Sequence, residues 1–129
     1  MAKDALCNLF SSTLTGTGTG SNGTAFDLKV GTPAEGLPIM IKVNGGQASS
    51  TATVALSITA SDDNFTTTHE TLWAKTINYT STNYAADFEE VYTLQTQRRY
   101  IRVVAGNPSA ALSPGSLITV DIVTGLLNP

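Results

Sequence analysis

The fold of this chain is decided by the stretch LPIMIKVNGG, residues 37–46, in which every second position from 37 to 43 is apolar. A period of two residues is typical of a β-strand with one buried face, and the closing Asn-Gly-Gly supplies the positive φ angles that a hairpin turn needs. The segment VALSITA, residues 54–60, has the same period. The sequence therefore predicts two antiparallel strands that are direct neighbours, joined by a hairpin.

The same alternation recurs along the rest of the chain, in segments bounded by Asn, Ser, Gly or Pro residues. These segments are residues 73–79, 88–94, 100–105 and 117–123. Seven or eight short strands at spacings of about ten to fifteen residues, with no amphipathic helix, favour two antiparallel sheets packed face to face. We therefore expect an all-β fold, an antiparallel β-sandwich that is jelly-roll-like.

The segment TGTGTGSNG, residues 15–23, is of low complexity, and its glycine content predicts a flexible arm or loop. It separates a short lead, which contains Leu6, Leu9 and Phe10, from the strands. So short a lead forms either one helical turn or an extended strand that docks an apolar edge. We expect a flexible Gly/Thr-rich N-terminal arm over residues 1–25 and a β-sandwich domain over residues 26–129.

The composition limits the classes of partner. The 129 residues carry 7 basic and 10 acidic side chains, a net charge of −3, which argues against binding a nucleic acid through its phosphates. The apolar runs are far shorter than the roughly 20 residues that a membrane-spanning helix needs, so no membrane partner is expected. The N-terminus lacks the apolar core of a signal peptide, which predicts a protein made in the cytoplasm. A chain of this length buries roughly two thirds of its unfolded surface without a disulfide or a metal.

Candidate catalytic groups are few. His69, the single histidine, lies in a polar stretch and is expected to be an exposed loop residue rather than a general base. Cys7 is expected to be a small buried apolar side chain rather than a reactive thiol. Glu89 and Glu90 are adjacent in a strand and so point to opposite faces, where they cannot act on one substrate atom. We predict no catalytic residue and a protein that is not an enzyme.

Two motifs have the spacing of a ligand site. Residues 18–23, GTGSNG, match a dinucleotide-binding fingerprint, but the strand-like segment that follows does not open the helix that such a site needs. Asp62, Asp63 and Asn64 could supply oxygen ligands to Ca²⁺, although a turn stabilised by Asx side chains is favoured. We expect no metal and no cofactor.

Arginines indicate a contact surface instead. Arg98, Arg99 and Arg102 place three of the seven positive charges within five positions, beside Tyr100. Arginine is favoured in protein interfaces, and the alternation of a strand would turn Tyr100 and Arg102 outward together. The alternative places Tyr100 in the core and leaves Arg102 solvated. The predicted interface residues are Leu6, Leu9, Phe10, Arg98, Tyr100, Arg102, Leu126 and Leu127.

Several segments carry a family resemblance. They are residues 4–5 (DA), 9–11 (LFS), 27–28 (DL), 55–65 (ALSITASDDNF), 99–103 (RYIRV) and 115–123 (GSLITVDIV). In their order and spacing, across nearly the whole chain, they resemble a family of tailed-bacteriophage capsid cement, or decoration, proteins, the group typified by the cement protein of a Bordetella podophage. The resemblance implies a jelly-roll-like sandwich on the outside of an icosahedral shell, where it bridges neighbouring major capsid protein subunits, often as a dimer.

The expected function is therefore that of a virion structural protein on the capsid exterior, which links capsomers and turns over no substrate. Its expected partners are the major capsid protein and a second copy of itself, with a dimer favoured and a trimer as the alternative. The runner-up is a carbohydrate- or receptor-binding β-sandwich of a phage tail, because the aromatic residues between Trp73 and Tyr92 also fit a platform for stacked sugar rings. A hydrolase that uses His69 is a third class.

Overall fold

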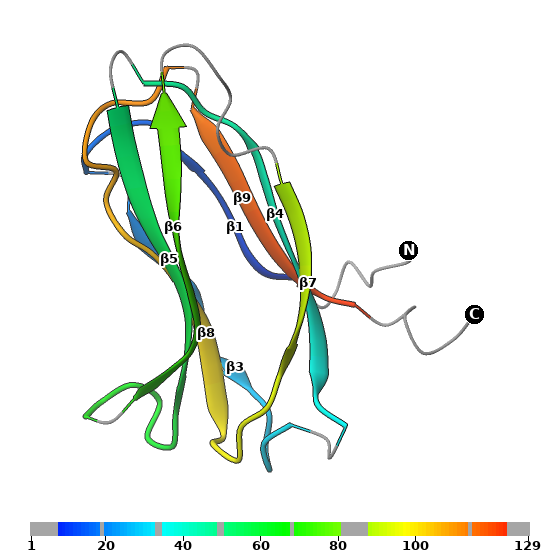
Figure 1. The fold of residues 1–129 in the computed structure, drawn as a ribbon. Helices are drawn as coiled ribbons and strands as arrows, with labels where there is room; N and C mark the ends of the chain where they lie inside the picture. The colour runs from blue at the N-terminus through cyan, green and yellow to red at the C-terminus, as the bar shows by residue number, and fades with distance from the viewer. Residues whose placement is uncertain are drawn as a thin grey trace.

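The computed structural model of the chain describes residues 8–18, 20–32, 35–48, 51–67, 69–80, 88–113 and 115–123. Over these residues it has nine β-strands and no helix, and the strands form two antiparallel sheets that face each other across one apolar core (Figure 1). The predicted all-β class and the antiparallel sandwich are confirmed. No helix long and apolar enough to span a membrane occurs in this part of the chain.

The strands of each sheet come from distant parts of the sequence. Sheet A contains, in spatial order, β1 (Asn8–Leu14), β9 (Ser116–Ile122), β4 (Leu37–Gly45) and β7 (Phe88–Leu94). Sheet B contains β2 (Ser21–Asn22), β8 (Tyr100–Ala105), β5 (Thr51–Ser61) and β6 (Glu70–Thr80), and β3 (Phe26–Asp27) also pairs with β8. The chain therefore passes from one sheet to the other at every connection except those from β2 to β3 and from β5 to β6.

The predicted hairpin between residues 37–43 and 54–60 is wrong. Both segments are strands with the expected buried faces, but β4 lies in sheet A and β5 in sheet B. Gly45 and Gly46 do adopt positive φ angles, 73° and 103°, and they turn the chain out of sheet A. Strands of both sheets bury one face against the same core, so alternation alone does not say which strands are neighbours. The hairpin partner of β5 is β6.

Inward-facing side chains of both sheets form the core. In β8, for example, Ile101 and Val103 are fully buried while the residues between them face outward. Each fully buried aliphatic side chain contributes about 1.5–3 kcal/mol of transfer free energy. Tyr79 of β6 also lies in the core, and its hydroxyl donates a hydrogen bond of 2.8 Å to Ser116 Oγ of β9, which joins the two sheets. Burial raises the pKa of Tyr79 above its ordinary value.

The described residues before position 25 are part of the sandwich rather than a separate arm. β1 forms an edge of sheet A along β9, and β2 lies beside β8 in sheet B. Leu9 and Phe10 of β1 are only 7% and 5% exposed, and Leu14 is fully buried. The predicted boundary between an arm and a domain at residue 25 is therefore corrected, because an apolar edge strand removes from water the surface that a free arm would leave exposed.

Candidate functional site

The predicted arginine-rich segment lies at the end of sheet B where β8 begins, beside the loop that joins β5 to β6 (Figure 1). Antiparallel pairing of β5 with β8 sets Thr59 opposite Arg102 and Ser61 opposite Tyr100. Residues directly opposite each other in an antiparallel pair share a face. Tyr100 and Arg102 are both half-buried on the outer face, so their predicted common orientation is confirmed.

Ser61 and Asp63 organise the loop after β5. The Ser61 hydroxyl donates a hydrogen bond of 2.7 Å to Asp63 Oδ1 and accepts hydrogen bonds from the backbone N–H groups of Asp63 and Phe65, at 3.2 and 3.0 Å. The two carboxylate oxygens of Asp63 accept hydrogen bonds from the backbone N–H groups of Thr66 and Thr67, at 3.2 and 3.0 Å. This is the predicted turn stabilised by an Asx side chain, and it is confirmed.

The same loop holds Phe65 in a backbone conformation that bulky side chains rarely adopt. Asn64 and Phe65 have φ angles of 56° and 62°, in the left-handed region. Such strain costs on the order of 1–3 kcal/mol, and the hydrogen bonds of Ser61 and Asp63 offset it. The centroid of the Phe65 ring consequently lies 4.2 Å from Arg102 Cζ, a cation–π contact that fixes the position of the guanidinium.

The two other arginines are neutralised within the protein. Arg98 Nη1 lies 2.9 Å from Asp62 Oδ2, and Arg98 Nε lies 3.2 Å from Glu70 Oε1. Arg99 donates two parallel hydrogen bonds to the carboxylate of Asp27, of 2.9 and 2.8 Å, from Nε and Nη2. Both guanidinium groups therefore have their charge balanced by carboxylates of this chain.

Arg102 has no such partner. Among the described residues no carboxylate binds its guanidinium, and its Nε is buried without a hydrogen-bond partner. The hydroxyl of Thr59, directly opposite on β5, is likewise buried and unpaired in this part of the chain. Buried donors without acceptors raise the free energy of the folded protein. Arg102 therefore carries a positive charge that no carboxylate of the described residues balances, and its guanidinium is held over the Phe65 ring.

The Asp27 and Arg99 pair predicts that stability depends on pH. Hydrogen bonding to Arg99 holds the pKa of the Asp27 carboxyl well below its usual range. A carboxyl with a lowered folded-state pKa stabilises the protein above its unfolded pKa, about 3.9, and the stabilisation is lost as the pH falls toward the folded-state pKa. We expect Asp27→Asn to lower the melting temperature at pH 7, and the difference to shrink as the pH falls from about 5 to about 2. Calorimetry of both proteins over this pH range tests the prediction, and a difference in melting temperature that does not change with pH would contradict it.

Beside Arg102, the outer face of sheet B is built from short, uncharged side chains. We name as the threonine face Thr53, Ala55 and Ser57 of β5 together with Ala74, Thr76 and Asn78 of β6, which pair directly across the two strands. Five of the six are exposed, and the sixth, on β5, is half-buried. Side chains this short lose little rotamer freedom when another surface covers them, and none carries a charge that must be desolvated. The threonine face therefore suits contact with another protein.

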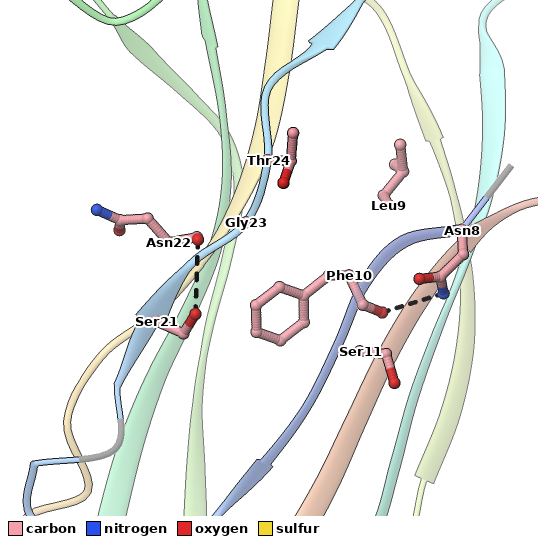
Figure 2. A pocket seen from close by; sticks show the side chains of 8 residues that line it. All are labelled: Asn8, Leu9, Phe10, Ser11, Ser21, Asn22, Gly23 and Thr24. Atoms are coloured by element: carbon pink, nitrogen blue, oxygen red, sulfur yellow. Dashed lines mark hydrogen bonds between the residues drawn. The ribbon is translucent and has the colours of Figure 1, made fainter.

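A hollow of about 310 Å³ lies between β1 and the segment that begins with β2, where the edges of the two sheets approach each other (Figure 2). Its lining residues are Asn8, Leu9, Phe10, Ser11, Ser21, Asn22, Gly23 and Thr24. Figure 2 shows the Phe10 ring pointing from β1 toward residues 21–24. None of the lining side chains is an acid or a base near neutral pH, so the hollow offers no general acid or base.

A second hollow, of about 400 Å³, is lined by Asp62, Glu70, Gln97 and Arg98. Both of its carboxylates lie within 3.2 Å of the Arg98 guanidinium, whose one positive charge attracts both of them. Thr96 Oγ1 also donates a hydrogen bond of 3.1 Å to Glu70 Oε1. The side chains that line this hollow are therefore bound to one another by ion pairs. No group of three or more His, Cys, Asp or Glu residues that could hold a metal ion occurs among the described residues.

The other predicted interface residues have different places in the structure. Leu9 and Phe10 are a correction, because they fill the core between the sheets and present almost no surface to a partner. Arg98 is occupied by its ion pairs. Leu6, Leu126 and Leu127 lie outside the described residues, as does Cys7. His69 is exposed, as expected of a loop residue.

Sequence reasoning missed Phe65 and the threonine face. The sequence does indicate the threonine face, since residues 51–57 place small polar or small apolar side chains at every second position, between the core residues. No sequence pattern indicates the position of Phe65, because a phenylalanine with a positive φ angle contradicts the preference of its residue type. Its position follows from the hydrogen bonds of the loop.

Comparison with models of known protein families finds none that matches the chain, and a search of curated proteins finds no relative of it.

Proposed function

We propose that this protein is a virion structural protein that binds the outer surface of an icosahedral bacteriophage capsid and stabilises it by bridging major capsid protein subunits. The observation that carries the proposal is Arg102, whose guanidinium is held over Phe65 without an acceptor in the described chain, beside the uncharged threonine face. Such a group favours a carboxylate of another protein. On this proposal the protein is made in the host cytoplasm and resides on the capsid exterior.

The resemblance to capsid cement proteins supports the choice of partner. The strand order supports the finer, jelly-roll type of sandwich, because the chain passes repeatedly between the sheets and each sheet collects strands from both halves of the sequence. The mechanism would be multivalency. A modest contact on each protomer, repeated at many symmetric sites of a shell, resists expansion that one contact could not resist.

A carbohydrate- or receptor-binding role in a phage tail has less support. Of the aromatic residues suggested for stacking on sugar rings, Tyr79 is fully buried and Trp73 packs against the core. Tyr92 is 37% exposed at the edge of sheet A, and Tyr84 lies outside the described residues. A glycan array distinguishes the two roles, since specific binding of one saccharide would favour the tail protein.

We expect Arg102→Gln to weaken binding to assembled shells by about tenfold to thirtyfold, the effect of losing an anchor worth about 1.4–2 kcal/mol. Its melting temperature should change little, because the loss of the cation–π contact with Phe65 is offset by the removal of a buried Nε that has no hydrogen-bond partner. Cosedimentation of shells with increasing amounts of protein measures the affinity. The matched control is Arg99→Gln, which removes a charge that Asp27 already neutralises and should leave binding unchanged.

The affinities of the wild type and of Arg102→Gln should be measured both for assembled shells and for unassembled capsid protein. A bridging site exists only where two subunits meet, so the wild-type protein should bind shells more tightly than isolated subunits. Equal affinity for both would contradict bridging. Equal binding by Arg102→Gln and wild type would contradict the assignment of the site, and a fall in melting temperature that parallels the loss of binding would show a structural role for Arg102.

A further inference from the structure

The two sheets have four edges, and three of them carry a feature that hinders pairing with another chain. The ladder of β1 is irregular between Asn8 and Phe10. The edge strand β6 carries the exposed Lys75, and its ladder with β5, regular from Thr51↔Thr80 to Ile58↔Trp73, is irregular between Ile58 and Thr59. The remaining edge of sheet B is divided between β2 and β3, which have two residues each. Irregular ladders and very short strands are devices by which proteins prevent pairing at a sheet edge.

The fourth edge, β7, has none of these devices. It pairs with β4 over seven consecutive residues, from Leu37↔Leu94 to Val43↔Phe88, without a shift of register. It contains no Pro, Gly or Lys. In the described part of the chain β4 is its only pairing partner, so the other side of β7 presents a regular row of backbone donors and acceptors.

The middle of β7 is also apolar and exposed. Val91 and Tyr92 are adjacent, and they are 41% and 37% exposed. Val91 lies opposite Met40, which is 9% exposed on the outer face of sheet A, and Tyr92 lies opposite Ile39. A strand added beside β7 would remove both side chains from water and extend an apolar contact that already exists on β4.

We propose that β7 pairs antiparallel with β7 of a second copy of this chain, about a two-fold axis at Val91, so that sheet A continues from one protomer into the other. Val91 is the central residue of Phe88–Leu94, so this register pairs the whole strand with its copy. An isologous contact of this kind closes at two chains. The proposal goes beyond capsid binding and does not rest on it.

The charges of β7 select the same register. With the axis at Val91, Glu89 faces Thr93 of the second copy and Glu90 faces Tyr92, so no glutamate faces another. With the axis moved by one residue, the two copies of Glu90 would face each other, and like charges directly opposite destabilise an antiparallel pair. With the axis moved the other way, to Tyr92, only five of the seven residues of the strand would pair with their copies. The strand is therefore complementary to itself in one register.

Sedimentation velocity of the full-length protein over a concentration series, with the variant Val91→Lys, tests the proposal. We expect the wild type to dimerise and Val91→Lys to be monomeric, because it places two lysines opposite each other at the axis. The matched control is Leu117→Lys, since Leu117 is 38% exposed on β9, inside the same sheet and away from its edges. Leu117→Lys should dimerise as the wild type does. The same oligomeric state for Val91→Lys and Leu117→Lys would overturn the proposal.

Two substitutions at Thr93, which is exposed, test the register. In the proposed dimer Thr93→Lys faces Glu89 of the other copy and should tighten the dimer, whereas Thr93→Glu should weaken it, each by about threefold to tenfold over two symmetric pairs. Equal dimer affinities for the two variants would reject the axis at Val91. A wild-type protein that stays monomeric at millimolar concentration, with β7 protected from hydrogen exchange only on shells, would assign the edge to a capsid segment and overturn self-pairing.

Discussion

Phe10→Ala is expected to lower the free energy of unfolding by about 3–5 kcal/mol, the usual effect of truncating a buried aromatic side chain. Phe10 is 5% exposed on the inner face of β1, and its ring approaches the backbone at Gly23 on the facing edge of sheet B. Truncation leaves a cavity between the two sheets that their paired strands cannot collapse to fill. Urea unfolding followed by the fluorescence of Trp73, the single tryptophan, measures the loss.

Ser11→Ala is the matched control. Ser11 is the next residue of β1 and is exposed on the opposite face, so its truncation should change the free energy of unfolding by less than about 0.5 kcal/mol. Comparison of the two variants shows whether β1 is an integral edge strand of sheet A or a free arm. If Phe10→Ala were as mild as Ser11→Ala, residues 8–14 would not contribute to the core in solution.

Gly46→Ala is expected to destabilise the protein by about 2–6 kcal/mol. Gly46 has a φ angle of 103°, which costs on the order of 1–3 kcal/mol for a residue with a Cβ atom. That Cβ would also overlap the ring of Tyr79 and lie 2.8 Å from Ser116 Cβ, and such overpacking costs about 1–3 kcal/mol more. The clash falls on the two residues whose hydrogen bond joins the sheets.

The control for Gly46 is Gly18→Ala, at a position where an added Cβ meets no atom within 4 Å. This substitution should leave the free energy of unfolding within about 0.5 kcal/mol of the wild type or raise it slightly, because it restricts the unfolded chain. Thermal and urea unfolding of both variants supply the comparison. Similar losses at Gly46 and Gly18 would show that the close packing around Tyr79 is not what makes Gly46 necessary.

The two proposed contact surfaces are compatible with each other. Pairing through β7 uses one edge of sheet A, whereas Arg102 and the threonine face lie on the outer face of sheet B. A dimer built through β7 would therefore carry two capsid-binding faces. Two linked contacts raise the effective affinity for a repeating surface without any new contact.

The candidate site could be predicted in part. Alternation in the strand set Tyr100 and Arg102 on one face, because that property depends only on adjacent residues. It could not show that Arg98 is neutralised and Arg102 is not. Two of the carboxylates that bind these arginines, Asp62 at Arg98 and Asp27 at Arg99, lie 36 and 72 positions away in the sequence, and they meet the arginines only after the strands have paired.

The sequence by itself determined the properties that depend on near neighbours along the chain. These are the strands and their buried faces, which follow from the period of two, and the turn that Asp63 stabilises, whose hydrogen bonds span three or four residues. Only the tertiary structure decided that β4 and β5 belong to different sheets and that β1 closes the core. Every strand of a sandwich buries one face, so the same alternation is compatible with many pairings. The choice among them rests on contacts between residues as distant as Asn8 and Asp121, which lie 113 positions apart.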